Sequence, residues 1–194
     1  MSCIFDPPSI WPRRLTGFTL IEVLVAMVIV SVGLLGIAGL VVESQKNAFE
    51  VQQRATALQL AEDLMGRVNA NPDGIASYAV DLSAKPDEPA TLCDGADSNC
   101  SPVQMAEFDL WQWGQALYGT EIKTEDDLDV GGLVSPMACI DVVGSTLSVT
   151  IVWRGKFTRP DSKAAEACGD GENQYTSTAD NDLRRVMTLN TRVG

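Results

Sequence analysis

The chain has 194 residues, a formal net charge of −12 and no histidine. Its first seventeen residues carry a net charge of +1, so the rest carries −13, which argues against nucleic-acid binding because phosphate backbones are held mainly by Lys and Arg. The absence of histidine excludes Ser-His and Cys-His nucleophile pairs and imidazole metal sites. With 45% apolar residues, the composition fits one packed domain plus an anchor.

The first predicted element is an apolar helix. From Phe18 to Val42 the only polar residues are Thr19, Glu22 and Ser31. At about 1.5 Å per residue, a helix of this length can cross a hydrocarbon core of ~30 Å. The run therefore predicts a transmembrane segment at residues 18–42.

Residues 1–17 precede this segment and include Arg13 and Arg14. The positive-inside rule places that end in the cytoplasm and the chain after Val42 on the other side. A secretory signal would have an apolar region of about 7 to 15 residues and an A-x-A-like cleavage site, and the sequence around Val42 has neither. We therefore expect the segment to be retained.

A more polar helix is predicted to continue over residues 43–71. Apolar residues recur there at steps of three and four, which indicates one buried stripe; they are Val51, Ala55, Leu58, Ala61, Met65 and Val68. The stretch from Asn69 to Gly74 should end the helix, because Pro72 disfavours a helical residue before it and Asp-Gly favours a turn.

The stretch GFTLIE, from Gly17 to Glu22, stands directly before the apolar run and resembles the class III signal of type IV prepilins. The resemblance implies that a prepilin peptidase/methyltransferase cuts between Gly17 and Phe18 and methylates the new N-terminal Phe18. From Arg13 to Gly74 the sequence is more narrowly similar to the PilV family of minor pilins, the type IV pilus modification proteins. Residues 1–17 would then be the prepilin leader.

Glu22 is costly at a bilayer centre, by roughly 2.5 to 3.5 kcal/mol on insertion scales. The family resemblance implies that it forms an assembly charge pair with the N-terminal amine of a neighbouring subunit. After cleavage, Glu22 would lie within about 6 Å, along the helix axis, of its own chain's new amine, and thus near the interface. The alternative is a carboxylate that only snorkels to the headgroups.

Gly33, Gly36 and Gly39 repeat at steps of three inside the apolar run. Small residues let membrane helices approach closely, which predicts helix packing. Each interior Gly also weakens a helix by about 1 kcal/mol relative to Ala, which predicts flexibility. Both interpretations stay open.

Residues 72–194 are predicted to form a globular domain. Residues 78–102 are rich in Pro, Asp and Ser and read as a loop. A short helix follows over residues 103–119, with either Phe108, Trp111 and Leu117 or Leu110, Trp113 and Leu117 at helical spacing.

Two strands joined at Gly144 and Ser145 are predicted within residues 138–155, because a Gly-Ser pair suits a tight turn. Leu147, Val149, Ile151 and Trp153 alternate with Thr146, Ser148, Thr150 and Val152, so one face should be buried. A third strand is expected near residue 187, with Met187, Leu189 and Val193 on one side and Arg184, Thr188, Asn190 and Arg192 on the other. An α+β fold follows, in which an antiparallel sheet packs on the second half of the long helix, as the resemblance to type IV pilins implies.

Four cysteines follow the apolar run: Cys93, Cys100, Cys139 and Cys168. An even number outside the cytosol favours disulfides over buried thiols, and zinc-type C-x2-C pairs are absent. Of the three possible connectivities we expect Cys93–Cys100, which is local, and Cys139–Cys168, which joins the hairpin to the loop before the last strand. The acidic stretch 124–132 does not fit an EF-hand loop, because Gly131 and Ala138 would fall at ligand positions, so no metal or cofactor is expected.

The sequence therefore predicts a structural subunit and no enzyme. By resemblance it is a minor pilin that helps to prime type IV pili at the pilus tip, with other minor pilins, the major pilin and inner-membrane lipid as partners. It would sit in the inner membrane with its C-terminal domain in the periplasm before it joins the pilus. The alternatives are a minor pseudopilin of type II secretion and a membrane-anchored periplasmic adhesin.

Overall fold

The computed structural model describes residues 17–95, 99–120, 122–126 and 129–193. The chain divides into an N-terminal unit, Met1–Gln45, and a C-terminal unit, Lys46–Gly194. Helix α1, Leu20–Ala70, begins in the first unit and ends in the second. Arg13, Arg14 and nearly all of the predicted leader lie outside the described residues.

In the N-terminal unit, α1 is exposed at every residue up to Gln45. It is long and apolar enough to cross a membrane, and none of its most apolar window is buried in the protein. The predicted apolar helix is confirmed as a helix. Its side chains are covered by no other described part of the chain.

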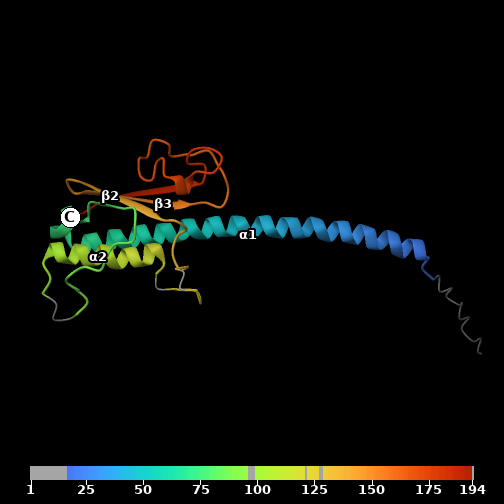
Figure 1. The fold of residues 1–194 in the computed structure, drawn as a ribbon, viewed down its shortest axis with the longest axis horizontal. Coiled ribbons are helices and arrows are strands. Elements are labelled where there is room, and N and C mark those ends of the chain that lie inside the picture. Colours follow the sequence, from blue (N-terminus) through green and yellow to red (C-terminus); the bar gives the residue numbers. More distant parts are fainter. Residues whose placement is uncertain (1–16, 96–98, 121, 127–128, 194) are drawn as a thin grey trace, which may run out of the picture. The chain divides into compact units, whose positions relative to one another are not determined.

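The remaining elements all belong to the C-terminal unit (Figure 1). In chain order they are the 3-10 helix η1 (Pro72–Tyr78), strand β1 (Val80–Leu82), helix α2 (Pro102–Tyr118), strands β2 (Met137–Val143) and β3 (Thr146–Arg154), the 3-10 helix η2 (Asn173–Tyr175) and strand β4 (Arg184–Arg192). The strands form one antiparallel sheet in the order β1-β2-β3-β4.

The predicted hairpin and last strand are confirmed. Gly144 has φ 61°, a left-handed conformation that the tight turn between β2 and β3 requires and that glycine adopts without strain. Ile151 pairs with Met187, and Val149 with Leu189, so the apolar faces of β3 and β4 are in register. Strand β1 was missed, because three residues inside a polar stretch give no alternating pattern.

The main core lies where α1, α2 and the sheet meet (Figure 1). Leu64 and Val68 of α1, Trp113 of α2, and Ile140 and Ile151 of the sheet are buried in one cluster. This confirms the α+β architecture, with a long helix packed on a four-stranded antiparallel sheet. Of the two helical spacings proposed for α2, the one with Leu110, Trp113 and Leu117 describes its buried face more closely, since Trp111 is only half-buried.

The predicted stripe on the second half of α1 was partly wrong. Ala61 and Val68 are buried, but Val51, Ala55 and Leu58 are exposed. The buried residues are Gln53, Ala57, Ala61, Leu64 and Val68. The stripe starts with a polar residue because the Gln53 side-chain oxygen accepts a hydrogen bond from the Val134 amide at 3.0 Å. The spacing of apolar residues cannot indicate that a glutamine is buried.

The second face of the sheet is also covered, contrary to expectation. Thr150 and Val152 are buried beneath the loop between β3 and β4, where Val152 packs with Cys168 and Tyr175. Arg184, expected among exposed polar residues, is 3% exposed. A loop of nearly thirty residues folds back over the sheet here, which no periodicity within the strands could indicate.

Candidate assembly site and its surroundings

The start of α1 holds the residues that the sequence singled out for processing. Gly17 and Phe18 are exposed and precede the helix. The Glu22 amide donates hydrogen bonds to the Thr19 carbonyl at 3.1 Å and to Thr19 Oγ1 at 3.3 Å. Thr19 therefore caps the helix. This role was not predicted, although Thr-x-x-Glu before an apolar run is a known N-terminal signature.

Glu22 stands in the first turn of α1, where a carboxylate interacts favourably with the helix dipole. A shallow groove on this face of the helix is lined by Phe18, Glu22, Ala26 and Val30 among others. Within the described residues, no hydrogen bond or ion pair engages the Glu22 carboxylate. The interaction with the helix dipole thus explains why a carboxylate can stand at this position. A cationic group of another molecule could pair with it.

Gly33, Gly36 and Gly39 lie in an unbroken stretch of α1. Apart from the adjacent backbone of α1 itself, a methyl group added at any of the three would meet no atom of the described residues within 4 Å. The glycines therefore satisfy no packing need within the described part of the chain. Packing against a partner helix and flexibility in the filament both stay predictions.

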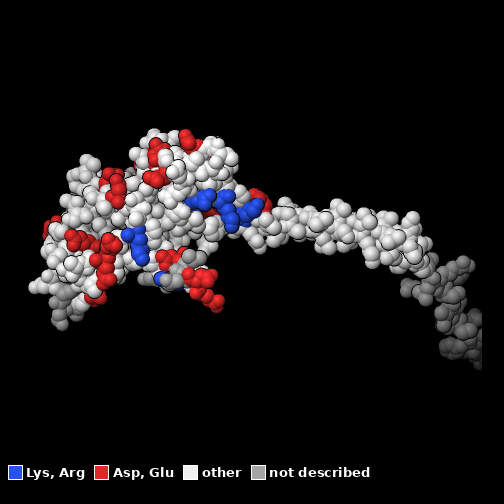
Figure 2. All heavy atoms as spheres, in the orientation of Figure 1, with Lys and Arg blue, Asp and Glu red and all other residues white. Residues whose placement is uncertain are grey.

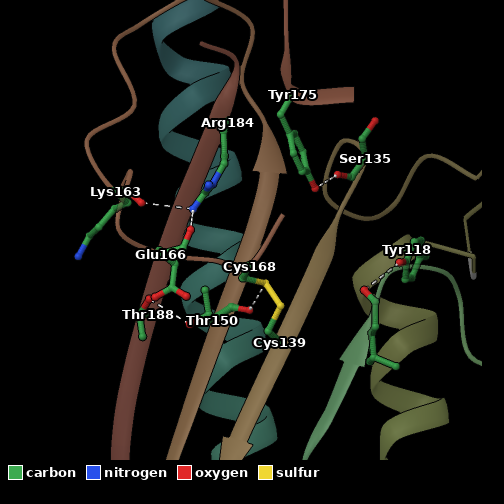
Figure 3. Close-up of a disulfide and its surroundings, with 11 residues drawn as sticks. Tyr118, Ser135, Cys139, Thr150, Lys163, Glu166, Cys168, Tyr175, Arg184 and Thr188 are labelled. Atoms are coloured by element: carbon green, nitrogen blue, oxygen red, sulfur yellow. Dashed lines mark hydrogen bonds between the residues drawn. A yellow bond between two sulfur atoms is a disulfide. The ribbon is translucent and has the colours of Figure 1, made fainter. Parts of the chain in front are cut away.

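Both expected disulfides are present in the C-terminal unit. Cys93–Cys100 closes a loop between β1 and α2, and Cys139–Cys168 ties β2 to the long loop before β4 (Figure 3). The second bond joins residues that are 29 positions apart. It fixes the loop that covers the second face of the sheet.

Arg184, the first residue of β4, also binds this loop (Figure 3). Its guanidinium donates to the Lys163 carbonyl at 3.3 Å, to the Glu166 carbonyl, and to Asp170 Oδ1 at 3.3 Å. These hydrogen bonds offset part of the cost of burying the arginine. The disulfide and Arg184 together give the loop a defined shape in an otherwise irregular segment.

The charged surface of the C-terminal unit is uneven. On the face shown in Figure 2, acidic side chains are scattered over the unit, while the largest group of Lys and Arg lies beside α1. Two cation–π pairs belong to this region: Lys46 lies 5.5 Å from the Phe157 ring, and Lys156 lies 5.1 Å from the Phe49 ring. The sequence analysis did not single out these residues.

Two family models match the chain. Residues 13–38 match the prokaryotic N-terminal methylation motif, and residues 39–111 match the Tt1218-like family, described as type IV pilin Tt1218. By these matches, residues 13–111 are similar to type IV pilins. No curated protein and no solved structure matches the chain in these comparisons.

The methylation motif covers the Gly17–Phe18 junction and Glu22, the residues that the sequence analysis selected. In type IV pilins this motif implies processing by a prepilin peptidase and assembly with other pilins. Type IV pilins are structural proteins rather than enzymes. The exposed apolar part of α1 is long and apolar enough to serve as a membrane anchor.

Proposed function

We propose that this pilin is a minor pilin that primes type IV pilus assembly and stays at the pilus tip. Residues 18–42 would span the inner membrane, residues 43–71 would carry the helix into the periplasm, and residues 72–194 would form the exposed domain. The similarity of residues 13–74 to PilV-type minor pilins supports this specific role. Glu22 is the residue on which its mechanism depends.

The observation that carries the proposal is the Glu22 carboxylate, which no described residue pairs with, at the start of an exposed apolar helix and within the matched methylation motif. Cleavage after Gly17 would create an ammonium group on Phe18 of each subunit. In a water-poor setting an opposite charge attracts far more strongly than in water, so a neighbour's amine would offset the cost of the carboxylate. Subunits would then be held in the register that brings amine and carboxylate together.

A piliation assay tests this. Surface pili are counted in a deletion strain and in strains complemented with the wild type, Glu22→Ala or Glu62→Ala. Glu62 is an exposed carboxylate on the same helix and serves as the matched control. We expect few pili in the deletion strain and with Glu22→Ala, and full rescue by the wild type and by Glu62→Ala.

Membrane extraction must show that the Glu22→Ala chain is processed and disulfide-bonded, since the proposal assigns Glu22 to assembly and not to insertion. Normal piliation without the gene would refute the priming role. Loss of protein secretion with unchanged pili would point to a type II secretion pseudopilin instead. Full rescue by Glu22→Ala would refute the charge pair.

A further inference from the structure

A polar pocket of about 310 Å³ lies in the C-terminal unit beside the first turns of α1 in that unit. Its walls come from three places: Asn47, Glu50 and Arg54 on α1, Trp153 at the end of β3, and the loop with Arg159 and Asp161. The first residues of β4, Arg184 and Arg185, complete it. We call it the arginine pocket.

The arginine pocket is positively charged in a protein of net charge −12. Four arginines line it against two carboxylates. Arg185 Nε is 3.2 Å from Glu50 Oε2, and Arg184 Nη1 is 3.5 Å from Asp161 Oδ2, so both carboxylates are already neutralised. Arg54 and Arg159 are exposed and have no ion pair with any described residue. Their two charges are therefore available to an anion.

Some buried polar atoms of the pocket residues also lack hydrogen bonds from any described residue. Within the described residues, two donors, Trp153 Nε1 and Arg184 Nε, and one acceptor, Asp161 Oδ2, make no hydrogen bond. Trp153 and Arg184 are each only 3% exposed. Buried polar atoms without a hydrogen bond are rare in folded proteins, because the hydrogen bonds that they made to water are not replaced. All three side chains line the pocket, which favours a ligand that both accepts and donates hydrogen bonds.

The position of the pocket along the chain limits what such a ligand can be. Asn47 follows the end of the apolar run at Val42 by five residues, so it lies within about 18 Å of that end even if the chain is fully extended. The headgroup layer adds about 5 to 7 Å to each side of the hydrocarbon core. The neighbouring pairs of Lys46 with Phe157 and Lys156 with Phe49 combine an apolar body with a cationic end, which suits a membrane interface.

We propose that the arginine pocket binds the headgroup of a membrane phospholipid whose phosphate is followed by a hydroxyl or ammonium donor, as in phosphatidylglycerol or phosphatidylethanolamine. This inference rests on the proposed function, that of a pilin anchored in a membrane. Arg54 and Arg159 neutralise the phosphate, one of its oxygens accepts from Trp153, and the donor end reaches Asp161. The headgroup would thereby hold the C-terminal unit against the membrane until assembly extracts the subunit.

Nuclear magnetic resonance of the full chain in neutral detergent tests this. The indole N–H signal of Trp153 is assigned with Trp153→Phe and followed while dihexanoyl phosphatidylglycerol, dihexanoyl phosphatidylcholine or acetate is added. We expect phosphatidylglycerol to shift the signal at a concentration at least tenfold lower than either of the others. Phosphatidylcholine has the phosphate but no donor, and acetate represents a carboxylate of a neighbouring subunit.

The double variant Arg54→Gln/Arg159→Gln should weaken the response to phosphatidylglycerol about thirtyfold, because each cation near a lipid surface adds about five- to sixfold. The matched control Lys85→Gln/Arg192→Gln removes the same charge at exposed sites outside the pocket and should bind as the wild type does. An equal loss in the control would refute the pocket.

An unshifted Trp153 signal in a chain that is processed and membrane-embedded would overturn this inference and leave the proposed function intact. A response to acetate as strong as that to phosphatidylglycerol would also overturn it, in favour of a carboxylate from another subunit. A chain found outside the membrane would instead refute the proposed function.

Discussion

Replacing Tyr78 with Phe should be the most damaging of three comparable Tyr→Phe changes in the C-terminal unit. Tyr78 is fully buried at the end of η1, and its hydroxyl donates to Asp109 Oδ2 of α2. The other oxygen of Asp109 lies 3.3 Å from Arg67 Nη1 on α1. The hydroxyl thus joins three elements through one largely buried carboxylate.

The expected loss in the free energy of unfolding depends on whether the hydrogen-bond acceptor is charged. A hydrogen bond to a charged group contributes about 1.5 to 3 kcal/mol, and a neutral one about 1 kcal/mol. Tyr78→Phe should therefore lower the free energy of unfolding by about 2 kcal/mol. Tyr175→Phe, which loses a 2.9 Å bond to the Ser135 carbonyl, should cost about 1 kcal/mol, and Tyr118→Phe, with a 3.4 Å bond to the Leu82 carbonyl, about 0.5 kcal/mol or less.

The effect of Tyr78→Phe should be constant between pH 6 and 9. Burial, reinforced by the hydrogen bond to Asp109, raises the pKa of Tyr78 above its usual value near 10. A raised pKa means that the neutral hydroxyl contributes its full stability below pH 10 and loses it only as the pH rises further.

Urea unfolding of the full chain in non-ionic detergent, followed by tryptophan fluorescence, measures these differences. Trp113 is a suitable reporter, because it is fully buried and its indole N–H donates to the Leu60 carbonyl at 2.8 Å. Equal losses for the three variants, or a loss below about 0.5 kcal/mol for Tyr78→Phe, would refute the argument from the charged acceptor.

Three further predictions concern other parts of the molecule. Removing the Cys139–Cys168 disulfide by double Cys→Ala substitution should lower the free energy of unfolding by about 3.5 kcal/mol, and removing Cys93–Cys100 by about 2.5 kcal/mol, because the first closes the longer loop. The reverse order in urea unfolding would contradict this account, which is based on loop entropy. Desolvation acts to raise the pKa of Asp182, but hydrogen bonds from Thr178, Ala179 and Ser177 outweigh it, so the pKa is lowered. Asp182→Asn should therefore lower the free energy of unfolding at pH 7, and progressively less as the pH falls below about 4. Asp180→Asn, at an exposed site, should have little effect on the free energy of unfolding at either pH. Mass spectrometry of the membrane-extracted chain should find an N-methylated Phe18 at its start, and a chain that begins after Val42 would refute the processing.

Much of this fold can be predicted from the sequence because the signals are local. The apolar run of α1, the Gly144 turn and the alternation along β3 each depend on neighbouring residues, and the structure confirms all three. The pairing of the four cysteines could also be inferred, since one pair is close in sequence and only one partner then remains for each of the others. The processing motif is likewise read from a few consecutive residues.

Only the tertiary structure decided which polar side chains are buried. Gln53, Arg184 and Asp109 are polar and are therefore expected at the surface, yet all three are buried. Each makes hydrogen bonds with groups that are distant in sequence: Gln53 with the Val134 amide, Arg184 with the Lys163 and Glu166 carbonyls, and Asp109 with the Tyr78 hydroxyl. A polar side chain can be buried when its hydrogen bonds are replaced inside the protein, and no local pattern records which groups will replace them. The arginine pocket arises in the same way, because α1, β3 and β4 bring together charges that are more than a hundred residues apart.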